Sequence, residues 1–380
     1  MRLCMLNPFF YPYAGGTEKV IHEVGKRLAD RHEIHVLTSR LPGTPAHEVI
    51  DGMAIHRTPS AVLWHLPPPL PPPYPLSPLH LADLWKLRDC DAFHIHNRFC
   101  YQAGTLLMVK RAMRNKKLFL TLHNSRVRGI TPATDFLGGL YDESFGEAIM
   151  DDADAITAVS RYTLEATVPE GMRKKSRVIY DGIDTSFFTP EVDGSGVRKK
   201  FGVKAGERLL VCAARLVPQK GHRYLLQALA KLPKDTKLLC IGRGPLEGEL
   251  RSLAAKLGVG ERVMFTTGIP EPQFPAYYAA ADVFVFPTLW EPFGVALCEA
   301  MSTGRPIVAS GVDGVPEVVG DAGLLVPPRD PEALAGAIGR LLDSPKLCAQ
   351  LGKKARERAV QHFDWDQIAE QYAKFYASFE

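Results

Sequence analysis

Residues 291–299, Glu-Pro-Phe-Gly-Val-Ala-Leu-Cys-Glu, indicate the fold and the chemistry of this chain most directly. The apolar run 282–287 before them predicts a buried strand, and the residues after the glycine favour a helix. Glu291 is therefore expected in a loop, the helix begins near Gly294, and Glu299 lies inside it. Free amides at a helix N-terminus bind anions, and a neighbouring carboxylate can bind sugar hydroxyls. This order suits a ligand that contains both a phosphate and a sugar.

Two glutamates at this spacing also occur by chance, and surface glutamates are usually only solvated. The interpretation therefore depends on the remainder of the chain.

Bulk composition excludes several classes of protein. A length of 380 residues suggests two domains, and 46% hydrophobic with 23% charged residues excludes a disordered chain. The N-terminus lacks a signal-peptide pattern, and the seven cysteines stand singly, which predicts reduced thiols in a cytoplasmic protein. A net charge of +4 is too small to indicate nucleic acid binding. It is compatible with an anionic small molecule or with an anionic membrane surface.

Strand-like and helix-like segments alternate along the chain, which predicts parallel sheets covered by helices. In the first half, strands are expected at 3–7, 34–38, 54–57, 92–96, 118–123, 155–159 and 177–179, and helices at 17–29, 101–113 and 161–167. In the second half, strands are expected at 209–213, 238–241, 263–266, 283–286, 306–309 and 323–326, and helices at 221–230, 245–257, 274–281, 295–301 and 331–342.

The fold class expected is α/β, with two doubly wound, Rossmann-like domains facing each other across a cleft, where ligands bind at the carboxyl ends of the strands. Residues 1–185 form the first domain, and residues 186–362 form the second. The aromatic-rich segment 363–380 is expected to be a helix that crosses back to the first domain. The proline-rich segment 67–78 predicts a stiff excursion, which is either a rigid surface loop or an acceptor rim.

Two cations, Arg215 and Lys220, follow the first strand of the second domain at a helix start. Converging positive charges beside helix-end amides suit a diphosphate and stabilise it as a leaving group. A solvated basic loop is the alternative.

In the first domain, Gly15 and Gly16 follow the first strand and allow close backbone approach to a ligand. The pattern is not GxGxxG, so a dinucleotide site is not supported. His123 ends an apolar strand, and His94 and His96 end the preceding one, so the three are expected at one sheet edge. No HExxH motif or helical ligand spacing occurs in the sequence, and no metal site is predicted.

Several segments together resemble a family. The chain resembles the retaining GT-B glycosyltransferases of the glycogen-synthase-like superfamily, glycosyltransferase family 4, group 1. The matching segments are GGTE (15–18), TLHN (121–124), DADAITAVS (152–160), DGID (181–184), ARLVPQKG (214–221), GRGP (242–245), FTTGIP (265–270) and EPFGVALCEAMSTGRPIVAS (291–310).

The resemblance implies a role for each matched position. The residues matching Arg215 and Lys220 hold the donor diphosphate, and the one matching Glu299 holds the ribose hydroxyls. The one matching Glu291 holds the donor sugar, and His123 sits over that sugar from the other domain. Further donor-binding positions implied by the match are Gly15, Gly16, Gly268, Ile269, Phe293, Gly294 and Val295.

The chain departs from the family pattern at two positions. Asp181 replaces the usual Asn of the turn between the domains, and Arg243 replaces an acidic residue common in the GxGP turn. The second change leaves open whether the donor nucleotide is UDP or GDP.

The function implied is transfer of a hexose from a nucleoside diphosphate sugar to a hydroxyl of a glycan, glycolipid or lipid-linked sugar, with retention at the anomeric carbon. No cofactor and no metal are expected for the chemistry, since Arg215, Lys220 and helix amides supply the positive charge. Peripheral contact with the inner face of the cell membrane is also expected. The open alternatives are a sugar-nucleotide epimerase, a glycoside hydrolase that uses the two glutamates, and a catalytically silent sugar-nucleotide-binding protein.

Overall fold

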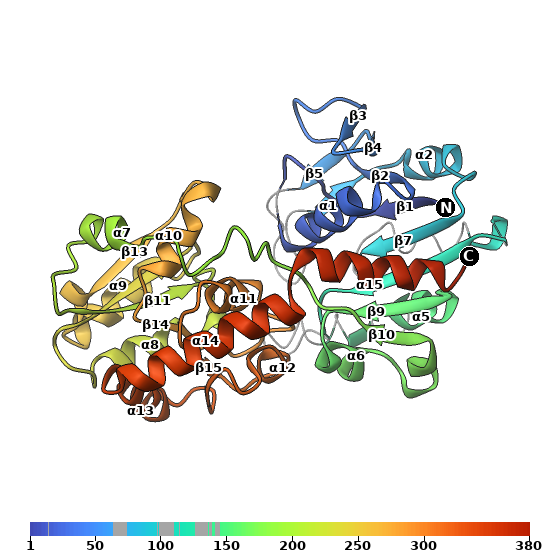
Figure 1. Ribbon diagram of the computed structural model, residues 1–380. Coiled ribbons are helices and arrows are strands. Elements are labelled where there is room, and N and C mark those ends of the chain that lie inside the picture. Colours follow the sequence, from blue (N-terminus) through green and yellow to red (C-terminus); the bar gives the residue numbers. More distant parts are fainter. Residues whose placement is uncertain are drawn as a thin grey trace. The chain divides into compact units, whose positions relative to one another are not determined.

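The computed structural model describes residues 1–13, 15–63, 74–96, 98, 110–113, 115–125, 136, 139–140 and 145–380 (Figure 1). The chain forms two compact units. Unit 1 comprises Met1–Asp181 together with Trp365–Glu380, and unit 2 comprises Gly182–Asp364.

Unit 1 is built on an eight-stranded sheet in the order β10-β9-β8-β7-β1-β2-β4-β3. Its neighbouring strands are parallel except for the edge strand β3, which runs antiparallel to β4. The chain order reverses between β1 and β7, the position at which open parallel sheets bind ligands at their carboxyl ends. The strands are β1 (Arg2–Leu6), β2 (Glu33–Ser39), β3 (His47–Ile50), β4 (Met53–Thr58), β7 (Ala92–His96), β8 (Lys117–Leu122), β9 (Ala155–Ala158) and β10 (Ser176–Val178).

Helices cover this sheet, and a short hairpin extends from it. The helices are α1 (Gly16–Leu28), α2 (His80–Lys86), α5 (Glu147–Asp152), α6 (Arg161–Thr167) and α15 (Trp365–Ala377). The hairpin pairs β5 (Ala61–Leu63) with β6 (Tyr74–Leu76) in antiparallel register. The core side chains of the sheet are mainly Leu, Ile, Val and Phe, as expected for strands buried on both faces.

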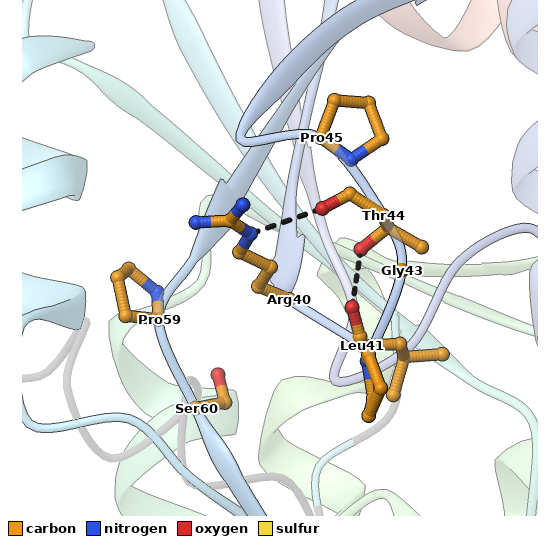
Figure 2. Close-up of a pocket in the computed structure, with 8 residues that line it drawn as sticks. Arg40, Leu41, Gly43, Thr44, Pro45, Pro59 and Ser60 are labelled. Atoms are coloured by element: carbon orange, nitrogen blue, oxygen red, sulfur yellow. Dashed lines mark hydrogen bonds between the residues drawn. The ribbon is translucent and has the colours of Figure 1, made fainter.

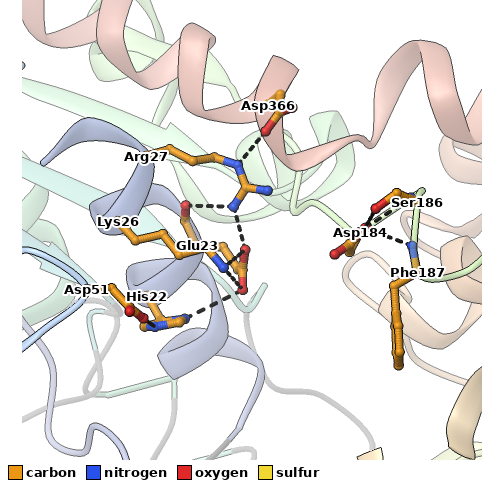
Figure 3. A network of polar contacts seen from close by, with 9 residues as sticks. All are labelled: His22, Glu23, Lys26, Arg27, Asp51, Asp184, Ser186, Phe187 and Asp366. Atoms are coloured by element: carbon orange, nitrogen blue, oxygen red, sulfur yellow. Dashed lines mark hydrogen bonds and ion pairs between the residues drawn. The ribbon is translucent and has the colours of Figure 1, made fainter. Parts of the chain in front are cut away.

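The helix α15 returns to unit 1 and lies beside α1 (Figure 1). Its buried face inserts Trp365, Tyr372 and Tyr376 into the core of the sheet, and each is at most 1% exposed. At its start, Asp366 accepts a hydrogen bond of 2.6 Å from Arg27 of α1. Figure 3 shows that Arg27 belongs to a polar network that continues through Glu23 and His22 to Asp51. Buried apolar contacts and surface ion pairs therefore both hold α15 against the rest of unit 1.

We expect Tyr376→Phe to lower the free energy of unfolding by about 1–2 kcal/mol, because it removes one partner of a buried hydrogen bond. The Tyr376 hydroxyl lies 2.6 Å from Nδ1 of the fully buried His94. Urea denaturation measures the change. Tyr224→Phe, at a half-buried tyrosine of unit 2 outside this core, is the comparison variant. Equal stability of the two variants would contradict a contribution from this bond.

Unit 2 is built on a six-stranded parallel sheet in the order β13-β12-β11-β14-β15-β16. In chain order this is 3-2-1-4-5-6, with the reversal between β11 and β14. The strands are β11 (Arg208–Ala213), β12 (Thr236–Ile241), β13 (Val263–Thr266), β14 (Val283–Phe286), β15 (Ile307–Ser310) and β16 (Gly323–Val326).

Unit 2 begins with a turn in which Asp184 accepts hydrogen bonds from the backbone amides of Ser186 and Phe187 (Figure 3). Its helices are α7 (Ser195–Lys200), α8 (His222–Leu229), α9 (Glu247–Lys256), α10 (Phe274–Ala279), α11 (Val295–Ser302), α12 (Val315–Val319), α13 (Pro331–Leu342) and α14 (Pro345–His362). The helix α14 packs against α11, and an added Cβ at its Gly352 would lie 2.3 Å from the carbonyl oxygen of Gly304, in the turn after α11.

The structure confirms the predicted α/β class with two doubly wound sheets. It adds elements that the sequence patterns do not predict, namely β3, the β5–β6 hairpin, α2, α5, α7, α12 and α14. The helix expected at 101–113 and the prolines 67–73 lie almost entirely outside the described residues. Within the described part of the chain, no helix is long and apolar enough to cross a membrane.

Candidate functional site

In unit 2, the loop after β11 carries both predicted cations. Arg215 is exposed, and its side chain makes no hydrogen bond or ion pair with the residues that the structure describes. Lys220 is more enclosed, with a side chain 15% exposed, and its Nζ lies 2.6 Å from Oε2 of Glu291. The structure thus brings the phosphate-loop lysine and the first glutamate of segment 291–299 into direct contact across 71 residues of sequence.

Close backbone packing holds this loop against the loop that follows β14. Gly221 has φ of +65°, and a Cβ at this position would lie 2.0 Å from the carbonyl oxygen of Pro287. The carbonyl of Gln219 accepts hydrogen bonds from the Leu289 amide at 2.7 Å and from the Thr288 hydroxyl at 3.1 Å. Glycine is required at 221 by both conformation and space. Lys220 and Glu291 consequently sit on two loops fixed to each other at the switch point of the sheet.

The segment 291–299 has the predicted order of loop and helix. Gly294 adopts φ of +104° and precedes α11, where it offers no side chain to cap the first amides of that helix. The backbone of Glu291 is held on both sides, because its amide donates to Asp313 at 2.8 Å and its carbonyl accepts from Gly314 at 3.1 Å. Phe293 is buried and packs edge-on against Phe363. The carboxylate of Glu291 therefore stands on a fixed backbone beside a helix N-terminus.

Glu299 lies within α11, behind the loop. Its Oε2 accepts a hydrogen bond of 2.6 Å from the hydroxyl of Tyr278, which extends from α10. Burial, and then the negative charge of Glu299, raise the pKa of Tyr278 well above its ordinary value, so the hydroxyl stays a donor. No sequence pattern distinguishes Tyr278 as a site residue, since two adjacent tyrosines in a helical segment have the pattern of ordinary core residues. The tyrosine orients the carboxylate.

Two further turns lie at the carboxyl ends of neighbouring strands. Gly268 follows β13, has φ of +68°, and has open space where a Cβ would project, with Ile269 next to it. After β12, Gly242 and Gly244 pack against the carbonyls of Ala214 and Leu216, at 2.1 and 2.3 Å from an added Cβ. These contacts join the turn that carries the exposed Arg243 to the phosphate loop. Apart from Glu299, which lies inside α11, the predicted site residues of unit 2 thus lie on segments that follow the carboxyl ends of strands in one sheet.

In unit 1, His123 follows β8 and is 8% exposed. Its Nε2 lies 3.1 Å from Nδ1 of His96, and its Nδ1 lies 3.7 Å from a carboxylate oxygen of Asp181. Burial lowers the pKa of His123 to about 3, so the imidazole is neutral at pH 7. A neutral ring can donate or accept a hydrogen bond, but it cannot supply positive charge.

His94 is not at a ligand-facing position, which corrects the expectation that all three histidines end their strands alike. It is fully buried between Tyr376 of α15 and Thr121 of β8, at 2.6 and 2.7 Å. Its role is to connect the returning helix to the sheet. The alternation of side chains along β7 does not distinguish the two histidines, because His94 and His96 lie on one face of the strand and are both buried. They differ in their partners, since His96 contacts His123 whereas His94 contacts Tyr376 and Thr121.

We expect acid to destabilise unit 1 through these histidines. Burial lowers the pKa of both His123 and His94 to about 3, below the ordinary value of about 6.5. Their contribution to stability is fully present above pH ~6.5 and is lost as the pH falls toward 3, at roughly 2 kcal/mol per histidine by pH 5. Urea denaturation between pH 7 and pH 5 measures this loss, and His123→Gln should show a smaller one. An identical loss in that variant would contradict the assignment.

The paired glycines of unit 1 have a local structural reason. Gly15 precedes α1, and an added Cβ there would lie 2.4 Å from Oε2 of Glu18. Asn7 at the end of β1 donates a hydrogen bond of 2.8 Å to Oε1 of the same carboxylate. Burial raises the pKa of Glu18, which is 7% exposed. Gly16 has open space around it, and so remains compatible with close approach of a ligand.

Among the described residues, no group of three or more His, Cys, Asp or Glu side chains is arranged to hold a metal ion.

Comparison with known proteins gives two family matches. Residues 14–187 match the model described as Glycosyltransferase Family 4, and residues 196–358 match the model described as Glycosyl transferases group 1.

Individual relatives agree with these matches. The chain is 37% identical over 232 residues to a GDP-mannose-dependent alpha-(1-6)-phosphatidylinositol monomannoside mannosyltransferase of Mycolicibacterium smegmatis, a match that covers 57% of this chain and 60% of that protein. It is 28% identical to the N-acetyl-alpha-D-glucosaminyl L-malate synthase of Bacillus anthracis, over 96% of this chain and 94% of that protein. Among solved structures, a sucrose-phosphate synthase from Thermosynechococcus elongatus superimposes with a TM-score of 0.81 and 26% identity, covering 100% of this chain and 98% of that one.

Proposed function

We propose that this chain, which belongs to the family 4, group 1 glycosyltransferases, transfers a hexose from a UDP- or GDP-linked sugar to a hydroxyl group of a glycan, glycolipid or lipid-linked sugar. The single observation that best supports this is the contact between Lys220 and Glu291 at the switch point of the sheet in unit 2. A cation for phosphate and a carboxylate for sugar hydroxyls stand there side by side, as a nucleoside diphosphate sugar requires.

In the proposed reaction, Lys220 and Arg215 bind the donor diphosphate. They stabilise the negative charge that develops on it as the bond to the sugar breaks. The backbone amides of Phe293, Gly294 and Val295, at the start of α11, are proposed to add positive dipole character at the same place. Together these groups supply the charge stabilisation that a metal provides in other phosphate-transfer sites, so we propose that the chemistry needs no divalent ion.

The two glutamates divide the remaining contacts. Glu299, oriented by Tyr278, is proposed to accept hydrogen bonds from the ribose hydroxyls. Glu291 is proposed to bind hydroxyls of the transferred sugar, and Lys220 holds its carboxylate in place until the donor arrives. The turn at Gly268 and Ile269 is proposed to frame the base, since the open space at Gly268 permits close approach.

His123 is proposed to hydrogen-bond the donor sugar from unit 1. Its pKa of about 3 supports a neutral donor or acceptor in that role. We propose retention at the anomeric carbon by a front-face route, in which a donor phosphate oxygen takes the proton of the incoming hydroxyl. The lipid acceptor named for the mycobacterial relative supports peripheral contact with a membrane.

The test is a thermal-shift panel of UDP-, GDP- and ADP-linked hexoses, followed by an assay of the favoured donor. A bound donor stabilises the folded protein by mass action, so one nucleotide series should raise the melting temperature most. Slow release of free sugar from that donor in the absence of acceptor would support a transferase over a silent binder. Conversion of the donor to an epimer would instead identify an epimerase, and stabilisation by no donor would overturn the proposal.

A further inference from the structure

Unit 1 contains a hollow at the carboxyl edge of its sheet, which we term the loop pocket. It has a volume of about 740 Å³ and lies between the loop 40–45, which follows β2, and residues 59–60, which follow β4 (Figure 2). Its lining comprises Arg40, Leu41, Pro42, Gly43, Thr44, Pro45, Pro59 and Ser60. This volume falls within the ~300–1,000 Å³ range of pockets for small organic ligands.

Hydrogen bonds hold the rim of the loop pocket in shape. The Arg40 amide donates to the carbonyl of Thr58 at 2.8 Å, which fastens the loop to β4. Across the loop, the Thr44 hydroxyl donates to the carbonyl of Leu41 at 2.7 Å (Figure 2). The Thr44 amide donates to the same carbonyl at 3.1 Å. Beneath it, the buried Arg57 donates to the carbonyl of Pro45 at 3.3 Å. The pocket is therefore formed without a ligand.

The lining presents one cation among neutral groups. Of the described residues that line the pocket, only Arg40 has an ionisable side chain. Its Nε donates to the carbonyl of Thr44 at 3.0 Å, which orients the guanidinium and leaves its two terminal nitrogens as donors (Figure 2). Paired terminal N–H groups match the oxygens of a phosphate. Glu48, the acidic residue of the edge strand β3, is already paired with Arg57.

The remaining walls suit a ring with hydroxyl groups. Pro42, Pro45 and Pro59 provide apolar surface without backbone N–H donors. The hydroxyl of Ser60 donates to the carbonyl of Thr58 at 2.7 Å and also contacts the hydroxyl of Ser77, which leaves one lone pair that can accept from a ligand hydroxyl. An apolar wall, hydroxyl acceptors and an oriented guanidinium together match a sugar or polyol ring that bears a phosphate.

The sheet order gives the distance from this pocket to His123. The pocket lies at the ends of β2 and β4, and His123 lies at the end of β8, with β7 and β1 between. The middle of the pocket, between β2 and β4, is therefore three and a half strand spacings from β8, which corresponds to about 17 Å. A single sugar ring cannot span that distance, so one ligand that reaches both positions is extended.

We propose that the loop pocket binds a phosphate-bearing sugar or polyol ring at the far end of an extended acceptor, with Arg40 as the phosphate ligand. The identification of this ligand as the acceptor rests on the proposed function. The phosphate comes either from a soluble phosphorylated glycan or from a phospholipid headgroup, and the chemistry at Arg40 is the same for both.

The test measures binding by the full chain without any donor, so it does not depend on transfer. Glucose 6-phosphate and glucose are titrated by ligand-observed NMR. Sedimentation is measured with phosphatidylcholine vesicles that contain or lack phosphatidylinositol. We expect Arg40→Ala to weaken binding of at least one phosphate-bearing probe about tenfold, and Arg40→Lys to restore it only in part, since lysine lacks the paired donors.

Arg88→Ala is the matched control, because Arg88 is an exposed arginine of unit 1 that precedes β7 and so lies near the opposite edge of the sheet. If Arg40→Ala weakens binding of glucose 6-phosphate but not of the vesicles, and Arg88→Ala weakens neither, the phosphate comes from a soluble phosphorylated glycan. If Arg40→Ala weakens binding of phosphatidylinositol vesicles but not of glucose 6-phosphate, the phosphate comes from a phospholipid headgroup. If Arg40→Ala matches Arg88→Ala for both probes, the pocket proposal is overturned. Failure of the wild type to bind any nucleoside diphosphate sugar would instead overturn the proposed function and leave this result standing.

Discussion

Lys220→Ala is expected to lower turnover by roughly 30- to 1,000-fold, which corresponds to about 2–4 kcal/mol of lost transition-state stabilisation. The reason is that Lys220 stands on a fixed loop at the switch point, where charge develops on the donor phosphate. Its Nζ is 2.6 Å from Glu291, so its removal also frees a half-buried carboxylate beside the diphosphate. Steady-state kinetics at saturating donor measures the loss.

Lys237→Ala provides a matched control for this change. Lys237 is paired with Glu207 at 2.7 Å, its side chain is 17% exposed, and it lies in β12 toward the opposite end of the same sheet. The two variants remove comparable ion pairs from unit 2, so they should lower the melting temperature by similar, small amounts. Only Lys220→Ala should lose activity. Wild-type turnover in Lys220→Ala would disprove the role of this lysine.

The second large effect separates the two glutamates. Glu299→Gln should weaken binding of the free nucleoside diphosphate by about 1.5–3 kcal/mol, because a carboxylate that accepts hydroxyl hydrogen bonds contributes about that much. Glu291→Gln should leave nucleoside diphosphate binding nearly unchanged and chiefly impair binding and transfer of the donor sugar. Calorimetric titration of the nucleoside diphosphate and of the intact donor distinguishes the two effects.

Tyr278→Phe serves as the control for the position of Glu299. It keeps the carboxylate but removes the 2.6 Å hydrogen bond that orients it, so it should give a smaller loss in the same direction as Glu299→Gln. The division of roles is wrong if Glu291→Gln and Glu299→Gln lose nucleoside diphosphate affinity equally, or if neither affects any ligand.

The fold was largely predictable because buried parallel strands are continuous apolar runs bounded by turns. The strands β7, β13 and β14 and the helices α6 and α13 have the bounds that their sequence patterns predict. The longest helix, α14, was missed because its apolar face is narrow. It buries mainly Leu351, Gly352, Ala355 and Ala359, and charged residues fill the rest. Similarly, β3 is a polar edge strand with exposed and half-buried positions in alternation.

The sequence predicts where the residues of the candidate site lie along the strands and loops, but not which of their side chains touch. Strand-end placement puts Lys220 and Glu291 at one sheet edge, yet no local pattern predicts that their side chains meet. Arg215 is exposed on the same loop as Lys220, and the convergence of the two cations on a diphosphate stays a prediction. Neither Tyr278 nor the loop pocket has a sequence signal, because both depend on segments that only the tertiary fold brings together.

The return of residues 365–380 to unit 1 imposes an order on biosynthesis. The ribosome produces Met1–Asp181 first, then all 183 residues of unit 2 from 182 to 364, and only afterwards the helix that carries Trp365, Tyr372 and Tyr376. Domains usually fold as they emerge, the N-terminal one first. We therefore expect the first-made unit to complete its core only when the last-made helix is available, and to expose apolar core surface until then. Unit 2, encoded without interruption, has no such delay.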